Sequence, residues 1–359
     1  MSTSAQVSTP VEPPLVAWDL EPVLGHLGSN PEDFRVDEIP AYAASGDGEH
    51  RLIRLEKVGM TTLDLVRVVS RAAKIQEREV GYAGLKDKHA ITSQWLSVPF
   101  RSTPPEQWEL PDSIRILEVG RHHNKLRTGH LRGNRFALRL TGTHPESRER
   151  LAPLVERLQR GSWNAFGAQR FGHGGENLGR ALAWIRGQEQ LRGPRARFLT
   201  KFYPSVIQSE LFNRYLLVRR DHGIKSLLPG EVVRLDGKRS CFVVDDLASE
   251  QARYDRGELH PQGPLFGKKM LASASRATEL EREVLAGLGL GEPELEALGR
   301  VAPGTHRDVW LRLEGLEATV EASGNVRLSF SLGAGSYATL VARELTREPW
   351  LSGSATASG

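Results

Sequence analysis

The chain of 359 residues is too long for one small domain and suits two, and its 39% apolar and 26% charged residues are typical of a globular protein. Its formal net charge of +4 permits a polyanionic partner without requiring one. A single cysteine, Cys241, excludes an internal disulfide and a multi-cysteine zinc site, and the lack of an apolar run of about 18 residues excludes a membrane-spanning helix.

Both ends of the chain predict disordered tails. Residues 1–14 are rich in Ser, Thr and Pro and lack the basic start and apolar stretch of a signal peptide. Residues 351–359 are mostly Ser, Ala and Gly. Together with the lone cysteine, this pattern predicts a cytoplasmic protein.

The first half of the ordered chain is rich in strands. Helices are indicated only after Thr61, which offers an N-cap, and from Leu151 to Leu158. Strands joined by short loops, without regular alternation of strand and helix, favour an α+β fold with mixed or antiparallel sheets. The expected strands are 34–39, 52–55, 80–83, 91–98, 114–122 and 135–140.

The second half begins with a glycine-rich stretch and contains more helix. Its last helix carries Tyr337 and Leu345 on one face. The segments 261–264 and 302–304 are interpreted as loops because they combine Pro and Gly. The expected helices are 177–186, 205–220 and 278–300 with a break near Gly291, and the expected strands lie within 231–244, 309–316 and 326–331.

Asp87 stands at the centre of the densest stretch of reactive side chains, Gly-Tyr-Ala-Gly-Leu-Lys-Asp-Lys-His-Ala at 81–90. The stretch falls in a loop between two expected strands. The charges of Lys86 and Lys88 should favour an ionised carboxylate, which can act as a nucleophile or a general base, and the same lysines could hold a phosphate. On composition alone, a solvated turn is the simpler interpretation. The spacing is not that of a P-loop.

A second stretch, residues 121–136, is dense in cations. It can contact phosphates, with Asn134 reading a base edge and Phe136 stacking on a base. The alternative is an exposed basic hairpin in which Phe136 begins the core of the next strand. A metal site is not expected, because His122 and His123 are adjacent and would point to opposite faces of a strand.

Two further stretches offer weaker signals. Residues 163–172 present Gln169 and Arg170 as nucleic-acid contacts, although composition alone favours a turn with inward-packed aromatic rings. Residues 333–339 join a strand to a helix, where Tyr337 could offer a stacking face beside an anion-binding helix end. The simpler interpretation is a helix capped by Ser336.

Together and in order, these stretches resemble the TruD family of tRNA pseudouridine synthases. The resemblance spans about 31–347, and its catalytic and Gln-Arg-Phe-Gly motifs are long and specific. The segments that carry it are Asn-Pro-Glu-Asp-Phe-Arg-Val at 30–36, the stretch 81–95, the stretch 126–136, Asn-Ala-Phe-Gly-Ala-Gln-Arg-Phe-Gly at 164–172, and 335–344.

The resemblance implies that Asp87 is the catalytic aspartate. The family pattern favours Phe where this chain has Tyr337, whose hydroxyl needs a partner. Some family members carry a lysine near the position of Gly28, and here none is present. The expected substrate-binding set is Phe34, Asn134, Phe136, Tyr337, Lys86, Lys88, Gln169 and Arg170.

The resemblance also implies a pseudouridine synthase catalytic domain with a mixed or antiparallel sheet, interrupted by an inserted α+β TRUD domain. We place the catalytic domain at 15–163 and 307–350 and the insertion at 164–306. The expected partner is tRNA. We expect a monomer, with no membrane association and no obligatory protein partner.

In the family that the chain resembles, the reaction breaks the N-glycosidic bond of uridine, rotates the base and rejoins it through carbon 5. The family precedent is uridine 13 of tRNA. Asp87 would either attack the sugar or take part in proton removal at the ribose. Because the reaction is an isomerisation, no metal, nucleotide or redox cofactor is expected.

Two other classes of protein are alternatives to this interpretation. A non-catalytic RNA-binding protein on the same fold could lose the aspartate, yet Asp87 stands within an intact motif. A carbohydrate hydrolase would need a second acid in a similarly organised loop, and the sequence offers none. A basic metabolic enzyme would leave the five ordered motifs unexplained.

Overall fold

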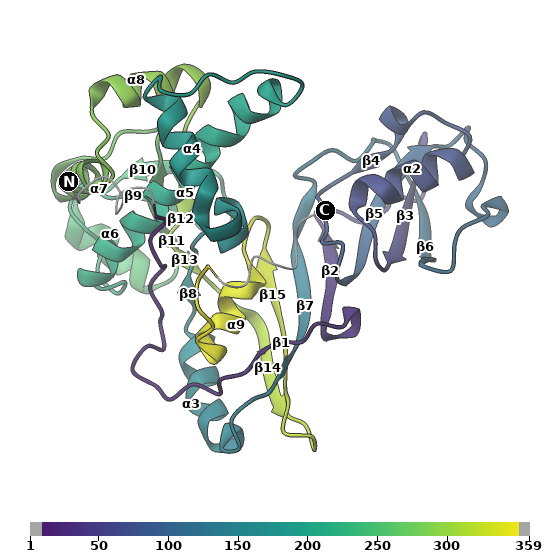
Figure 1. Cartoon of the computed structure of the whole chain (residues 1–359), viewed down its shortest axis with the longest axis horizontal. Helices are drawn as coiled ribbons and strands as arrows, with labels where there is room; N and C mark the ends of the chain where they lie inside the picture. The colour runs from purple at the N-terminus through teal and green to yellow at the C-terminus, as the bar shows by residue number, and fades with distance from the viewer. Residues whose placement is uncertain (1–8, 352–359) are drawn as a thin grey trace. The chain divides into compact units, whose positions relative to one another are not determined.

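The computed structural model of the chain describes residues 9–351, which form two compact units (Figure 1). The sheet unit contains residues 19–160 and 312–348, and the α5 unit contains residues 9–18, 161–311 and 349–351. The predicted insertion lies within the α5 unit. Across the described range, no helix is long and apolar enough to cross a membrane.

A mixed sheet forms the centre of the sheet unit, with nine strands among the described residues. Its order is β14-β15-β7-β2-β5-β3-β6, with β1 paired to β7 and β4 to β5. Only the β2–β5 pair is parallel in this part of the chain, which confirms the predicted α+β class with a mixed sheet. The strands are β1 (His26–Leu27), β2 (Phe34–Pro40), β3 (His50–Lys57), β4 (Gly81–Tyr82), β5 (Ile91–Pro99), β6 (Ile114–His122), β7 (Leu131–Thr141), β14 (Glu314–Val320) and β15 (Val326–Gly333).

Helix α2 (Thr62–Ala72) covers one face of this sheet because its apolar residues recur at helical spacing. Thr61 caps the helix by accepting a hydrogen bond from the backbone of Asp64, as the sequence predicted. Leu65, Val66 and Val69 then form one apolar core with Ile53, Leu55 and Leu96 of the sheet. Helices α3 (Ser147–Gln159) and α9 (Ala338–Thr346) complete the unit and contact each other.

The α5 unit is built around the long helix α5 (Ala196–Asp221). A four-stranded sheet of order β10-β9-β11-β12 packs against it, and a separate pair joins β8 to β13. The other helices are α4 (Glu176–Ile185), α6 (Leu247–Asp255), α7 (Ser275–Gly287) and α8 (Glu292–Val301). The strands are β8 (Ser162–Trp163), β9 (Val232–Leu235), β10 (Cys241–Val243), β11 (Leu259–Leu265), β12 (Thr305–Asp308) and β13 (Trp310–Leu311).

The loop predicted at 261–264 is wrong, because these residues belong to β11. Pro261 pairs with β9, and Gln262 to Leu265 pair with β12. Gly263 allows this strand to approach α5 closely, since a Cβ there would lie 2.7 Å from the Phe212 ring. Pro and Gly therefore mark a close sheet-to-helix contact here rather than a loop.

Residues 9–14, expected to belong to a disordered tail, instead pack against the α5 unit. Pro10, Pro13 and Pro14 are buried. The backbone N–H of Val11 donates to the carboxylate of Glu210 at 3.2 Å to each oxygen. Proline-rich composition indicated disorder, yet rigid proline side chains also bury apolar surface at low entropic cost. The rest of the predicted tails, 1–8 and 352–359, lies outside the described residues.

Candidate active site

The loop that carries Asp87 is held by its main chain between β4 and β5. The buried ammonium of Lys57, at the end of β3, donates to the backbone carbonyl of Asp87 at 2.8 Å and to that of Met60 at 2.6 Å. The backbone N–H of Lys86 donates to the Thr62 hydroxyl of α2 at 2.8 Å. The loop is therefore positioned by β3 and by the start of α2, while the Asp87 side chain keeps solvent access.

The strand register brings the neighbours of this loop to one face of the sheet. Lys57 pairs with Thr92, Thr92 with Val36, and Val36 with Phe136. Residues directly opposite one another share a face, so side chains from four strands form a continuous row. Two residues further along β2, Glu38 pairs with Asn134 and lies on the same face as Val36. Residues distant in sequence thus meet beside the Asp87 loop.

Lys86 does not offer its charge to Asp87 or to solvent. Its ammonium forms an ion pair with Glu38 at 2.5 Å, with 4% and 1% of the two side chains exposed. The other Glu38 oxygen accepts from the backbone N–H of Trp95 at 3.2 Å. The pair joins the loop to the centre of the sheet, so Lys86 supports the loop and its ammonium does not face a bound phosphate. Lys88 is exposed.

The ionisation of Asp87 is set by burial and by two cations other than those expected. Burial raises the pKa of the Asp87 carboxyl, and the charges of Lys57 and His89 act in the opposite direction. Burial has the largest influence on this pKa, although Asp87 as a residue is exposed. The prediction that Lys86 and Lys88 favour the carboxylate is therefore wrong in its assignment of the cations.

Lys57 is the residue of the site that sequence interpretation missed. Its side chain is fully buried, and burial lowers the pKa of its ammonium to about 8. The negative charge of Asp87 acts in the opposite direction and raises this pKa. A signal was present in the sequence. Ile53, Leu55 and Lys57 alternate along one strand, so the lysine continues the face that those apolar residues bury. A lysine on such a face needs a specific partner.

Replacing Lys57 by methionine should raise the pKa of Asp87, because the Lys57 charge lowers it. A carboxylate that must be ionised then becomes active only at higher pH. We expect the acidic limb of the kcat/KM profile to move to higher pH, so that activity falls most on the acidic side of the profile. Lys88→Met, on an exposed lysine next to Asp87, is the matched control and should leave the limb in place. An unshifted limb in Lys57→Met would contradict this electrostatic role.

Several polar atoms on the same face have no protein partner. The Asn134 amide oxygen, the Gln94 amide nitrogen and the Thr92 hydroxyl are buried without a hydrogen bond within residues 9–351. Buried polar atoms are normally paired, so unpaired ones mark places where water or a ligand belongs. Asn134, expected from the sequence to contact a base, therefore keeps free hydrogen-bonding capacity beside Glu38.

Aromatic side chains continue this face away from the Asp87 loop. Phe34 and Phe136 are stacked with ring centroids 6.4 Å apart, and Phe136 contacts Phe330 at 5.7 Å. Phe136 is buried, as the core interpretation anticipated, whereas Phe34 is only half-buried. Tyr337 is half-buried and occupies the N-cap position of α9, so the expectation that Ser336 caps this helix is wrong.

Gln169 and Arg170 belong to the α5 unit rather than to the sheet unit. They form part of a short 3₁₀ turn, Ala168–Phe171. Gln169 is exposed, and Arg170 donates to the Ser205 hydroxyl at 3.4 Å. Phe166 and Phe171 are buried, so the aromatic rings of this motif pack inward. The two polar residues are presented on a turn held by its aromatic neighbours.

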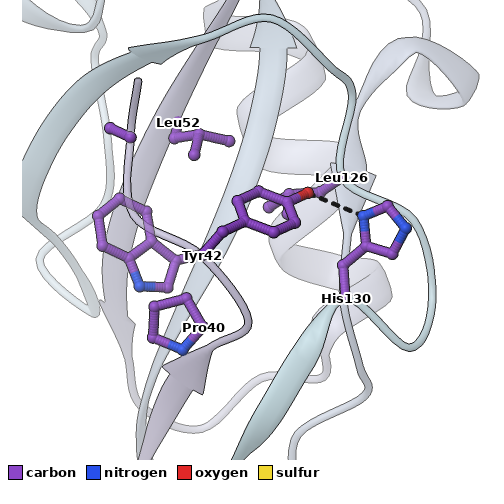
Figure 2. A pocket seen from close by; sticks show the side chains of 7 residues that line it. Pro40, Tyr42, Leu52, Leu126 and His130 are labelled. Atoms are coloured by element: carbon purple, nitrogen blue, oxygen red, sulfur yellow. Dashed lines mark hydrogen bonds between the residues drawn. The ribbon is translucent and has the colours of Figure 1, made fainter. Parts of the chain in front are cut away.

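Figure 2 shows a small, mainly apolar pocket lined in part by Leu52. Leu52 and Lys57 are five residues apart on β3, so their side chains point to opposite faces of the sheet. Trp95 also lines the pocket, and the Tyr42 hydroxyl forms a hydrogen bond with His130 Nδ1 at 2.8 Å. Tyr42 also stacks on His122, with ring centroids 4.6 Å apart. The basic stretch 121–136 connects β6 to β7, which are not neighbours in the sheet, so the hairpin interpretation of this stretch is wrong. Within it, the rings of His122 and His130 contact Tyr42. This pocket does not include Asp87.

Comparison with known proteins places this arrangement in a family. The family model described as tRNA pseudouridine synthase D (TruD) matches residues 11–182 and 196–345. A tRNA pseudouridine synthase D of Anaeromyxobacter sp. (strain Fw109-5) is 42% identical over 340 residues, covering 93% of this chain and 96% of that protein. That of Thermus thermophilus is 36% identical over 343 residues, covering 95% of this chain and 94% of that protein.

A solved structure shares the fold. It is the crystal structure of a Methanosarcina mazei protein described as a candidate tRNA pseudouridine synthase D (TruD). The two chains superpose with a TM-score of 0.72 at 22% identity, covering 97% of this chain and 98% of the other. At this identity the likeness concerns the fold alone.

Proposed function

The chain belongs to the tRNA pseudouridine synthase D (TruD) family of isomerases, and we propose that it converts uridine 13 of tRNA to pseudouridine with Asp87 as its nucleophile. The observation that carries the proposal is the loop of Asp87, which main-chain hydrogen bonds hold in place. Asp87 is held by its main chain while the residue stays exposed to solvent, beside the sheet face where the Asn134 amide oxygen lacks a partner within residues 9–351. We also propose that the sheet unit is the catalytic domain, that the α5 unit is the TRUD insertion, and that the enzyme works in the cytoplasm.

The reaction requires a carboxylate close to the ribose of an extruded nucleotide. As a nucleophile, the Asp87 carboxylate would attack carbon 1 of the ribose while the electrons of the N-glycosidic bond pass to the uracil. The detached base would then turn, its carbon 5 would bond to carbon 1 of the ribose and displace the Asp87 carboxylate, and carbon 5 would lose its proton while nitrogen 1 gains one. In the alternative route, the same carboxylate takes the proton from carbon 2 of the ribose, a double bond forms between carbons 1 and 2, and uracil leaves with the electrons of the glycosidic bond. The turned base then adds through carbon 5 to carbon 1 while carbon 2 regains a proton. Both routes need the ionised form, which the charges of Lys57 and His89 favour against burial.

The detached uracil must be held while it turns. Asn134 suits this task because an amide offers both a donor and an acceptor, and the edge of uracil presents an N–H between two carbonyl oxygens. The Asn134 amide oxygen lacks a partner within the described chain. Phe34 and Tyr337, both half-buried, would supply stacking surfaces. These contacts would also offset the cost of unstacking the target, about a few kcal/mol.

Replacing Asn134 by alanine should weaken the reaction without weakening the fold. The side chain leaves its buried oxygen unpaired in the free protein, so its removal breaks no hydrogen bond of that atom. We expect kcat/KM to fall by about 10- to 100-fold, with an unchanged or slightly raised Tm. Kinetics and thermal unfolding of the same preparation check both. Asn124→Ala, at an exposed position in the loop between β6 and β7, is the control. A large loss of Tm would indicate a structural role instead.

The proposed target is tested by mapping pseudouridine in two tRNA transcripts. One transcript carries uridine at position 13 and the other carries cytidine there. We expect pseudouridine at position 13 of the first transcript and none in the second. Pseudouridine at another position, with uridine 13 untouched, would overturn the proposed target while leaving the isomerase activity in place.

A further inference from the structure

The first turns of α5 and the loop before them form an exposed surface that the proposed catalytic face does not use (Figure 1). We call it the basic aromatic patch and define it as Arg192, Arg195, Arg197, Phe198 and Lys201. All five residues are exposed. The buried part of α5 begins only at Tyr203, so this end of the helix is not required to cover the core.

The charge of the patch is concentrated and unopposed. No acidic residue occurs between Glu189 and Glu210, whereas four cations fall within 192–201. The formal net charge of the entire chain is only +4. Arg195, Arg197 and Lys201 form no ion pair with any described carboxylate. Exposed cations without a carboxylate nearby present a positive field to a polyanion.

The aromatic part of the patch is exposed yet held in place. Phe198 is 62% exposed and stacks on Phe202 with centroids 5.4 Å apart and an interplanar angle of 15°. Phe202 contacts Tyr203 at 6.3 Å, and Tyr203 is buried. One face of the Phe198 ring is therefore supported from below. A large exposed ring on a fixed support is a stacking surface for a base.

We propose that the basic aromatic patch binds unpaired nucleotides of the RNA substrate, with the cations on the phosphates and a base on Phe198. The inference rests on the proposed use of tRNA as substrate. The combination of unopposed cations and a supported ring fits single-stranded nucleic acid, which offers phosphates and π-faces together. The match to the family model does not extend over residues 183–195, which include Arg192 and Arg195 of the patch.

The test compares two triple variants of the full chain. Arg195→Ala, Arg197→Ala and Lys201→Ala are combined in one protein. The control protein combines Lys238→Ala, Arg239→Ala and Arg282→Ala. These three cations are also exposed in the α5 unit. Affinity for a tRNA transcript is measured over a range of salt concentrations. We expect the slope of log K against log salt to fall by about 2 in the patch variant and not in the control.

Phe198→Ala tests the stacking contact separately. We expect affinity for the tRNA transcript to fall by about 5- to 100-fold with an unchanged salt slope and Tm. Equal affinity for tRNA in all variants would overturn the proposal. It would also be overturned if the patch variants kept tRNA binding but lost binding to anionic phospholipid vesicles, or lost self-association. If the wild-type protein binds tRNA but forms no pseudouridine, the proposed function fails and the patch is still tested by these affinities.

Discussion

Replacing Asp87 by asparagine is expected to reduce pseudouridine formation by about a thousand-fold or more while tRNA binding stays close to that of the wild-type protein. Asparagine has the shape of aspartate but cannot be ionised, so it can neither attack the sugar nor accept a proton from it. The main-chain contact from Lys57 involves the Asp87 carbonyl and remains possible. Single-turnover pseudouridine formation and filter binding of the same tRNA measure the two properties.

Asp112→Asn is the matched control, because this aspartate is exposed in the same unit and should tolerate the change. An Asp87→Asn protein within tenfold of wild-type activity would rule out the proposed role. Uridine deuterated at the ribose 2′ position separates the two routes in the wild-type enzyme. A slower reaction with this substrate indicates proton removal, and an equal rate favours attack on the sugar.

Replacing Glu231 by alanine is expected to destabilise the α5 unit by about 3–5 kcal/mol. Arg219 and Glu231 are both fully buried, and the guanidinium Nε donates to Glu231 Oε1 at 2.7 Å. The same carboxylate accepts from the backbone N–H of Leu228 at 3.0 Å. Its removal takes the carboxylate away from the buried Arg219 charge, which keeps only backbone carbonyl acceptors, and leaves the Leu228 N–H without this acceptor. Thermal unfolding should show a Tm lowered by about 6–20 °C.

Asp221→Ala provides the control for this measurement. Asp221 pairs with the neighbouring Arg220 at 3.0 Å, but both side chains are largely exposed. Breaking an exposed pair changes stability by about 0–1 kcal/mol. If Glu231→Ala and Asp221→Ala had the same Tm, the buried ion pair would not contribute to the stability of the α5 unit as expected. Equal loss of tRNA modification in both would point to an effect of charge rather than of folding.

The elements of the sheet unit could be predicted because each carries a local pattern. The apolar residues of the strand predicted at 52–55 and the Thr61 cap of α2 lie close together in sequence, and both predictions are confirmed. Helix α6 was missed because it buries no residue and therefore shows no apolar stripe. Its only signal was Asp246, whose side chain caps the helix.

The contacts of the candidate site were less predictable because they depend on pairing between distant strands. The parallel pairing of β2 with β5 brings Glu38 within reach of Lys86, which the sequence presented only as a neighbour of Asp87. The sequence predicts that the two lysines next to Asp87 are its electrostatic partners. The chain instead directs Lys86 into the sheet and supplies Lys57 from another strand.

The hydrogen bond from Lys57 to the Asp87 backbone carbonyl also has an entropic consequence. Ordering the backbone of a residue costs about 1–2 kcal/mol. If a loop becomes ordered only when substrate binds, the free energy of binding is less favourable by that cost. Here the loop backbone is ordered when the sheet unit folds, because its contacts come from β3 and α2. Catalytic competence and the fold of the sheet unit should therefore be lost in a single thermal transition, with no lower-temperature step in which activity disappears first.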